Sequence, residues 1–168
     1  WDGSSAIHMV SAWASANRLI IGQVKVDEKS NEITAIPALL RAIEIAGCIV
    51  TIDAMGCQRE IAATIIEADA DYLLAVKDNQ PTLHTAIAEV FATKLAQDEP
   101  PSDLHMAQNQ NHGHGRDEVR TTSTTDDLHT LSMSDKWEGL CSIAMVVAER
   151  TVNGTTSVER RYYISSML

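Results

Sequence analysis

The first part of the chain shows strand-like alternation of apolar and polar residues, followed by helical spacing. Period-two alternation predicts strands over 6–14 and 19–26, and the short polar break between them predicts a hairpin. Helical spacing is then carried by Ile36, Leu39, Leu40 and Ile43. We expect a helix with Thr34 as its cap, Pro37 in its first turn and Gly47 just past its end.

The middle of the chain alternates strand and helix patterns, which is typical of an α/β layer fold. A nearly continuous apolar run over 48–52 predicts an interior strand covered on both faces, and it ends on Asp53. A helix over 58–70 and a buried strand over 72–76 follow, and the next helix begins near Pro81. Two strands joined by one helix are expected to be parallel, so their carboxyl ends share one edge of the sheet.

The last third changes in composition. Residues 98–115 are rich in Pro, Gln, Asn and Gly and predict a long exposed loop. An extended segment over 116–125 comes next, and the strand patterns at 141–152 and 155–165 flank Asn153-Gly154. Asn-Gly between two strand patterns is a strong hairpin signal, because both turn residues adopt positive φ. This third is therefore expected to be β-rich.

Composition narrows the class of protein. The chain has 168 residues, 45% of them hydrophobic, which is enough for about one domain. Thirteen basic and 23 acidic residues give a net charge of −10, which argues against binding of nucleic acid by this chain alone. Three cysteines without a C-x-x-C pair indicate neither disulfides nor a zinc knuckle, and no apolar run spans a bilayer. We expect a cytoplasmic protein without a membrane segment, and a start at Trp1 suggests an excised piece.

Asp53 is the leading candidate for chemistry. A carboxylate at the carboxyl end of a parallel strand lies where open α/β sheets form their crevice. The polar loop Lys77 to Gln80 follows the next strand and is expected on the same edge, where it suits substrate contacts. The alternative is that Asp53 only caps the following helix or simply ends the strand. Asp53 alone would not suffice for a site that binds two metal ions, because such a site needs more than one carboxylate.

A second cluster lies further along the chain. His112, His114 and Glu118 fall within seven residues and could share a transition metal. Their spacing fits no zinc pattern, and a His-Gly-His-Gly segment is more often simply solvated.

Six segments, spread over essentially the whole chain, resemble segments of a known protein family. They are HMVSAW (8–13), EKSNEITAIP (28–37), TIDAMGCQ (51–58), KDNQP (77–81), HGRDEVR (114–120) and RYYISS (161–166). In this order they resemble the insertion-sequence DDE transposases of the H-repeat-associated group. The resemblance implies an RNase H-like mixed sheet with flanking helices, and a β-rich insertion over 116–168. The core would then occupy 1–97 and the loop 98–115.

The resemblance also implies a site in which three acidic residues hold two Mg²⁺ (or Mn²⁺) ions. Asp53 matches the second Asp. The first belongs to an Asp-Gly-Lys strand, and Asp2-Gly3 lacks both the Lys and the apolar strand. The third is the Glu of a helix beyond the Tyr-Tyr-Ile-Ser-Ser strand, with Glu118 as a substitute. The predicted DNA contacts are Lys77, Asn79, Gln80, Arg116 and Arg120.

We therefore expect the central part of a DDE transposase, inactive as this fragment, with transposon-end DNA and a further copy of the protein as partners. The family's missing first strand would lie between the hairpin and the strand ending at Asp53. A non-catalytic remnant or interaction module, and an unrelated α/β metal-dependent hydrolase, are the alternatives.

Overall fold

The N-terminal hairpin forms as the alternation predicts. The computed structural model describes residues 8–26, 31–113, 116–131 and 133–168. Strands β1 (Met9–Ala14) and β2 (Leu19–Lys25) pair antiparallel as a separate two-stranded sheet. Residues 6 and 7 of the predicted strand lie outside the described part of the chain. Helix α1 (Glu32–Ala42) packs on the hairpin, where Gly22 leaves room for the side chains of Leu39 and Ile43.

Helix α1 begins earlier than predicted, so the expected cap is wrong. Asn31, not Thr34, is the cap residue, and its Oδ1 accepts the backbone N–H of Thr34 at 3.2 Å. Glu32 then lies in the first turn, where a carboxylate interacts favourably with the helix dipole. Pro37 consequently lies inside the helix rather than in its first turn.

A six-stranded mixed sheet follows, in the order β3-β4-β8-β7-β6-β5. Only β3 and β4 are parallel, and all other neighbours are antiparallel. The strands are β3 (Ile49–Ile52), β4 (Asp71–Val76), β5 (His105–Gly113), β6 (Arg116–Thr125), β7 (Ser142–Val152) and β8 (Thr155–Ser165). Helix α2 (Arg59–Glu67) connects the parallel pair and α3 (Pro81–Leu95) follows β4, so the chain is mixed α/β.

Strand β3 departs from the prediction of an interior strand covered on both faces. It is an edge strand in the described structure, and the side chain of Ile49 is 57% exposed. Strand β4 has a neighbour on each side and buries Tyr72, Leu74 and Val76, as its apolar run predicts. An apolar run indicates where a strand forms, but burial depends on whether a neighbour covers it.

The exposed loop predicted over 98–115 is wrong for residues 105–113, which form β5. This strand pairs with β6 in nine consecutive registers, although all nine of its residues are exposed. Strand pairing uses backbone groups, so a Gln/Asn-rich segment pairs without burying its side chains. Strand β6 has the predicted bounds, and Asn153 and Gly154 turn the β7–β8 hairpin at φ 49° and 77°.

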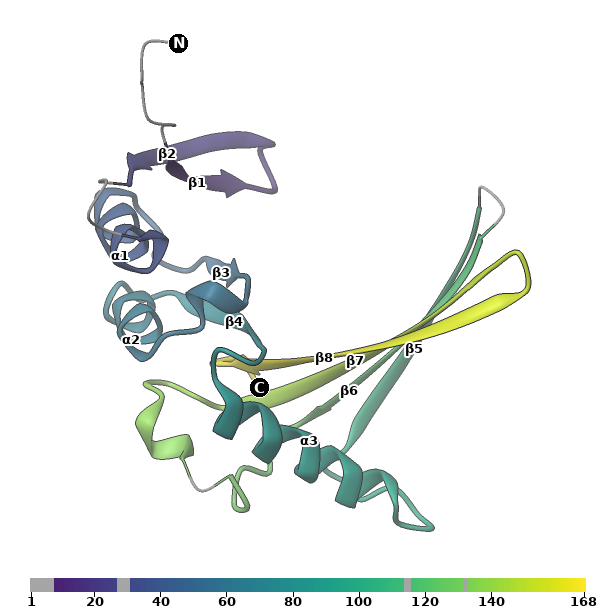
Figure 1. Cartoon of the computed structure of the whole chain (residues 1–168). Coiled ribbons are helices and arrows are strands. Elements are labelled where there is room, and N and C mark those ends of the chain that lie inside the picture. Colours follow the sequence, from purple (N-terminus) through teal and green to yellow (C-terminus); the bar gives the residue numbers. More distant parts are fainter. Residues whose placement is uncertain (1–7, 27–30, 114–115, 132) are drawn as a thin grey trace.

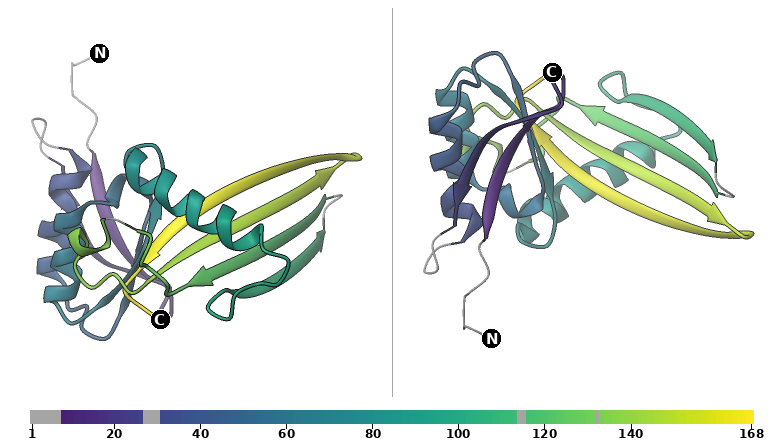
Figure 2. Two further views of the ribbon diagram at one scale, coloured as in Figure 1. Left: turned by 90° about the horizontal axis from the view of Figure 1, so that it is seen from below. Right: turned by 90° about the horizontal axis from the view of Figure 1, so that it is seen from above.

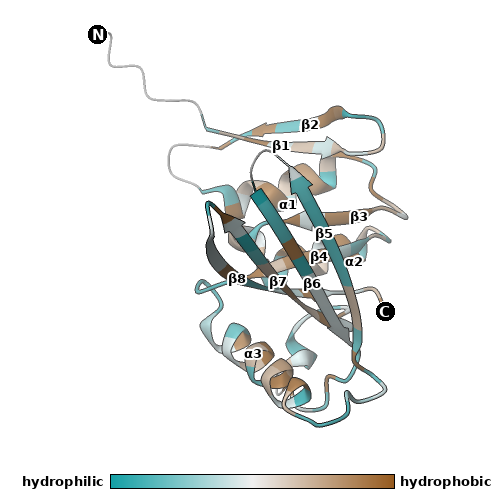
Figure 3. Cartoon of the chain, turned by 90° about the vertical axis from the view of Figure 1, so that its right-hand side faces the viewer, coloured by the Kyte–Doolittle hydropathy of each residue, from teal (hydrophilic) through white to brown (hydrophobic). Residues whose placement is uncertain are grey.

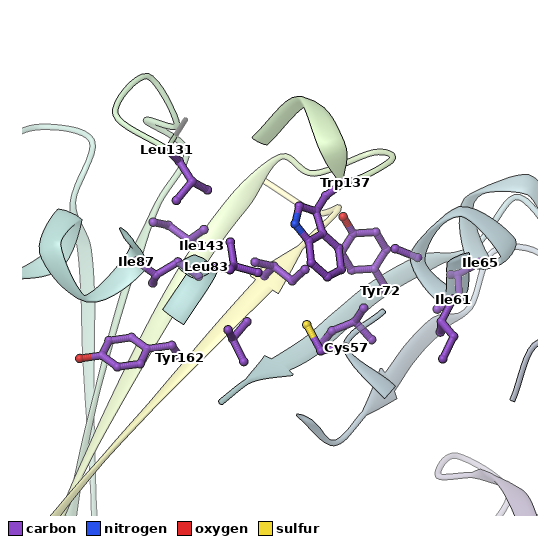
Figure 4. Packing of buried hydrophobic residues seen from close by; sticks show 14 of the residues in the cluster. Cys57, Ile61, Ile65, Tyr72, Leu83, Ile87, Leu131, Trp137, Ile143 and Tyr162 are labelled. Atoms are coloured by element: carbon purple, nitrogen blue, oxygen red, sulfur yellow. The ribbon is translucent and has the colours of Figure 1, made fainter. Parts of the chain in front are cut away.

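Strands β5 to β8, which we call the arm, project away from the helices (Figures 1 and 2). Helices α2 and α3 lie on one face of the sheet, which we call the covered face. Apart from Ser165, every buried residue of the sheet points to this face. Figure 4 shows part of that core, in which Tyr72, Leu83, Trp137 and Ile143 pack together. The opposite, open face carries Thr51, Leu73, Tyr163 and the alternate arm residues.

Candidate functional site

Asp53 directly follows β3 and is exposed to solvent. Its Oδ1 accepts the backbone N–H of Met55 at 3.2 Å, and it caps the short 3₁₀ turn Ala54–Gly56. Asp53 thus caps this short turn rather than helix α2, whose cap position is Gln58. Capping engages one lone pair of a group with about four acceptor positions, so it does not prevent a second role for the carboxylate.

The loop Lys77 to Gln80 lies beside this turn, as predicted. The Nδ2 of Asn79 donates to the carbonyl of Ala54 at 2.5 Å, and the Nε2 of Gln80 donates to the carbonyl of Cys57 at 2.9 Å. Parallel pairing of β3 with β4 brings the two carboxyl ends to one edge. The polar side chains of the loop thus hold the backbone that carries Asp53, which the sequence did not indicate.

Cys57 lies close to this turn but is not a nucleophile. It is fully buried, and desolvation raises the pKa of its thiol to about 12. Since the thiolate is the reactive form, this side chain stays protonated at neutral pH and packs as a small apolar group.

The outer edge of β3 has no strand partner in the described residues. β3 pairs only with β4, and β1 pairs only with β2. In Figures 1 and 3, β1 is the hairpin strand nearer to β3, and the two strands remain separate. Backbone N–H and C=O groups on this edge are therefore available to one more strand.

Glu118 is not brought together with Asp53. It lies on β6, four strand positions from β3, which at about 4.8 Å per strand is about 19 Å across the sheet alone, and it is further displaced along the strands toward the tip. Its carboxylate pairs with Arg120 at 2.7 Å. A metal site that needs both carboxylates within a few ångströms therefore cannot form from this pair.

His112 and Glu118 are also separated, because strand alternation puts them on opposite faces of the arm. His112 instead contacts Asp117 at 2.7 Å, and His114 lies outside the described residues. In the part of the chain that the structure describes, no three His, Cys, Asp or Glu side chains converge as a metal site. The described residues thus supply Asp53 as a single carboxylate and do not by themselves fit a two-metal centre.

Two further arginines, Arg150 and Arg161, lie near the predicted DNA contacts and were not predicted from the sequence. Strand register places Arg150 directly opposite Glu118. Arg161 lies on the same face, at the register position of Thr122 and two strands away from it. Counting outward from the Asn153-Gly154 turn could have indicated that Arg150 and Arg161 share a face, since a two-residue turn fixes the register of β7 with β8. It could not have indicated the pairing of Arg150 with Glu118 on β6.

Comparison with known proteins identifies the family. The model of the transposase DDE domain matches residues 2–168, so the chain belongs to this family. It is 41% identical to the H repeat-associated putative transposase YhhI and 41% identical to the putative protein YbfL, both from Escherichia coli. Each alignment covers 96% of this chain and 43% of the relative.

A protein of Xanthobacter autotrophicus, described as an uncharacterized protein in the dhlA 3′ region, is 39% identical over 96% of this chain and 53% of its own length. The chain thus spans about half the length of these relatives. No solved structure matches it. None of the described helices is long and apolar enough to cross a membrane.

Proposed function

We propose that this chain is the central part of the catalytic domain of a DDE transposase, which cleaves and joins DNA strands with bound divalent metal ions. The observation that carries the proposal is the position of Asp53 at the shared carboxyl edge of two parallel strands, in a chain of the DDE family. Under this proposal the sheet is RNase H-like, and the arm is a β-rich insertion in the RNase H-like core.

The remaining carboxylates must come from outside these residues. Two Mg²⁺ ions about 4 Å apart need several oxygen ligands, and Asp53 provides one carboxylate. The relatives are about twice as long as this chain. We propose that a strand of the longer protein pairs with the open edge of β3 and brings a further carboxylate next to Asp53. The chain alone is then inactive.

Bound metal would activate the attacking oxygen and stabilise charge on the phosphate. Within this chain, the N–H of Met55 orients the Asp53 carboxylate, while Asn79 and Gln80 hold its turn. Lys77 is exposed beside that turn and suits a phosphate contact, as do Arg116 and Arg120 on the arm. The proposed partners are transposon-end DNA and a second copy of the protein, in the cytoplasm.

The test compares the full-length protein with the chain as given in a Mg²⁺- or Mn²⁺-dependent nicking assay on supercoiled DNA. We expect the full-length protein to nick DNA, and Asp53→Asn to lower the rate by orders of magnitude. The amide oxygen of Asn can still accept the Met55 N–H, so the turn should remain intact. Asp78→Asn, in the neighbouring loop, is the matched control and should retain activity.

Three results would contradict this proposal. Equal nicking by Asp53→Asn and the wild-type full-length protein would remove Asp53 from the site. Metal-dependent nicking by the chain alone, abolished by Asp53→Ala, would show that its own residues already complete the centre. A full-length protein that folds but never nicks DNA would indicate a non-catalytic remnant.

A further inference from the structure

The arm differs in charge from the rest of the molecule. Strands β5 to β8 carry five arginines and four carboxylates, while the remainder of the chain carries eight basic and 19 acidic residues. The net charge of −10 is therefore located entirely outside the arm. A polyanion would be repelled over most of this molecule, and the arm is where it could approach.

Strand register then sorts the charges of the arm by face. Directly paired residues share a face, so the open face carries four arginines with Glu118 and Glu159. These arginines are Arg116, Arg120, Arg150 and Arg161. The opposite face carries Arg160 with Asp117 and Glu149. The open face thus has an excess of two positive charges, and the other face has an excess of one negative charge.

The four arginines are evenly spaced along the arm. In register order from the tip they are Arg116, Arg150, Arg120 and Arg161, each two positions from the next. At about 3.4 Å per residue this places one guanidinium about every 7 Å over about 20 Å. That length corresponds to about six base pairs of duplex DNA along its axis.

The ion pairs on this face do not prevent the arginines from binding phosphate. Arg120 pairs with Glu118 and Arg161 pairs with Glu159, at 2.7 and 2.8 Å. The two arginine side chains are 59% and 53% exposed. The Arg161–Glu159 pair is exposed on both sides, and such pairs contribute only about 0–1 kcal/mol. The Glu118 side chain is 15% exposed, so its pair with Arg120 is partly buried. The guanidinium groups remain accessible to solvent, and each keeps donors for phosphate oxygens.

The open face also leads from the arm toward Asp53. Lys77 directly follows β4, whose last residue Val76 pairs with Tyr162 of β8. Asp53 follows β3 on the far side of β4. The hydrogen bonds from Arg161 hold the pKa of Glu159 below its ordinary value, and the positive charge of Lys77 adds to this effect. Because Val76 pairs with Tyr162, Lys77 lies at the register position of Arg161 and extends the arginine row toward the Asp53 turn.

We propose that the open face of the arm binds the phosphate backbone of duplex DNA through Arg116, Arg120, Arg150 and Arg161, and directs it toward Asp53. Glu118 and Glu159 moderate this binding, because each neutralises one arginine and repels phosphate. This inference rests on the proposed function for its choice of polyanion. Phosphate contacts of this kind position DNA without reading its sequence.

The experiment measures binding of a fluorescein-labelled 30-base-pair duplex of arbitrary sequence by fluorescence anisotropy, from 50 to 200 mM salt. Each phosphate contact contributes about 0.9 to the slope of log affinity against log salt. Arg150→Gln and Arg161→Gln should each reduce that slope by about 0.9. The fourfold rise in salt would then weaken each variant about 3.5-fold less than the wild type.

Two further variants make the test specific. Arg160→Gln is the matched control, because Arg160 adjoins Arg161 in sequence but lies on the opposite face, and it should leave the slope unchanged. The double variant Glu118→Gln with Glu159→Gln should bind several-fold more tightly at 50 mM salt. Circular dichroism melting verifies that each variant is folded.

The proposal is overturned if the wild-type chain does not bind at 50 mM salt, or if Arg160→Gln weakens binding as much as Arg161→Gln. Loss of affinity in the double Glu variant would also contradict it. Its failure can be distinguished from failure of the proposed function. If the full-length protein binds DNA through this face but does not nick it, only the enzymatic proposal is refuted. If a full-length protein with all four arginines changed to Gln still nicks DNA and keeps its DNA affinity, only this inference is refuted.

Discussion

The two ends of β8 belong to different kinds of structure. Near the helices, Tyr162 and Ile164 are buried between β4 and β7, under α3. Toward the tip, the seven residues Thr155 to Arg161 are all exposed, although the same strand continues without a register shift. The base is stabilised by burying apolar area, and the tip by backbone hydrogen bonds and turn geometry.

This difference separates the roles that each region can have. The base fixes the carboxyl edge where Asp53 lies, because its strands are packed against α2 and α3. The tip buries almost no side chains, so its sequence is free to carry charge on both faces. Substitutions should therefore change stability at the base and binding at the tip.

The largest expected effect comes from a buried residue at the base of β8. Ile164→Ala removes a fully buried side chain and should lower the free energy of unfolding by about 2–5 kcal/mol. Val158→Ala, on the exposed part of the same strand, should change it by less than about 0.5 kcal/mol. Urea unfolding followed by circular dichroism measures both. Equal losses in the two variants would abolish the distinction between base and tip.

A smaller effect is expected at the turn of the arm. Gly154 has φ 77°, and an L-residue in the left-handed region costs about 1–2 kcal/mol. Gly154→Ala should therefore destabilise the arm by about that amount, since the added Cβ itself meets open space. Gly113→Ala is the control, because Gly113 also has open space but no positive φ. Comparable thermal unfolding of both variants would show that turn strain has no role here.

The smallest effect concerns pH at the outer end of α3. Lys94 is nearly buried and pairs with Asp103 at 2.5 Å and Asp127 at 2.9 Å, and these hydrogen bonds lower the pKa of both carboxyls. The folded state therefore binds protons less readily than the unfolded state. The stabilisation is complete above the ordinary pKa of 3.8 and is lost as pH falls through the lower folded values.

Lys94→Met should flatten the decline in unfolding free energy between pH 5 and pH 2, as measured by urea titrations. Lys136→Met, at an exposed lysine, should leave the wild-type profile in place. Because the two carboxylates are 29% and 34% exposed, solvent screens the pairs and the effect should be modest. Parallel pH profiles for Lys94→Met and wild type would assign this acid sensitivity to other groups.

Local patterns predicted much of this fold from the sequence. The hairpin β1–β2, helix α3 from Pro81 and the Asn153-Gly154 turn all form where their residues indicate. These features depend on interactions between residues close in the chain, such as turn conformations and helical periodicity. The proximity of Asp53 to the loop Lys77 to Gln80 was also predictable, because a parallel crossover joins the two segments.

Other features depend on which segments meet, and a local pattern does not contain that information. The run over 48–52 specified a strand, but only the sheet order makes β3 an edge strand with Ile49 exposed. Strand β5 lacks an apolar pattern and exists because its backbone pairs with β6. Helix α1 begins at Glu32 because the side chain of Asn31 caps it, a start that the apolar spacing did not indicate.

The sequence by itself determined that Asp53 follows a strand and lies beside the next loop, and that five arginines occur in the last third of the chain. The tertiary structure decided that Glu118 lies four strands from Asp53 and pairs with Arg120, and that four of those arginines share one face. The physical reason is that the side chains of a strand alternate between the two faces of the sheet. Whether residues on different strands share a face is therefore set by the pairing register, and this register joins segments that are distant in the chain.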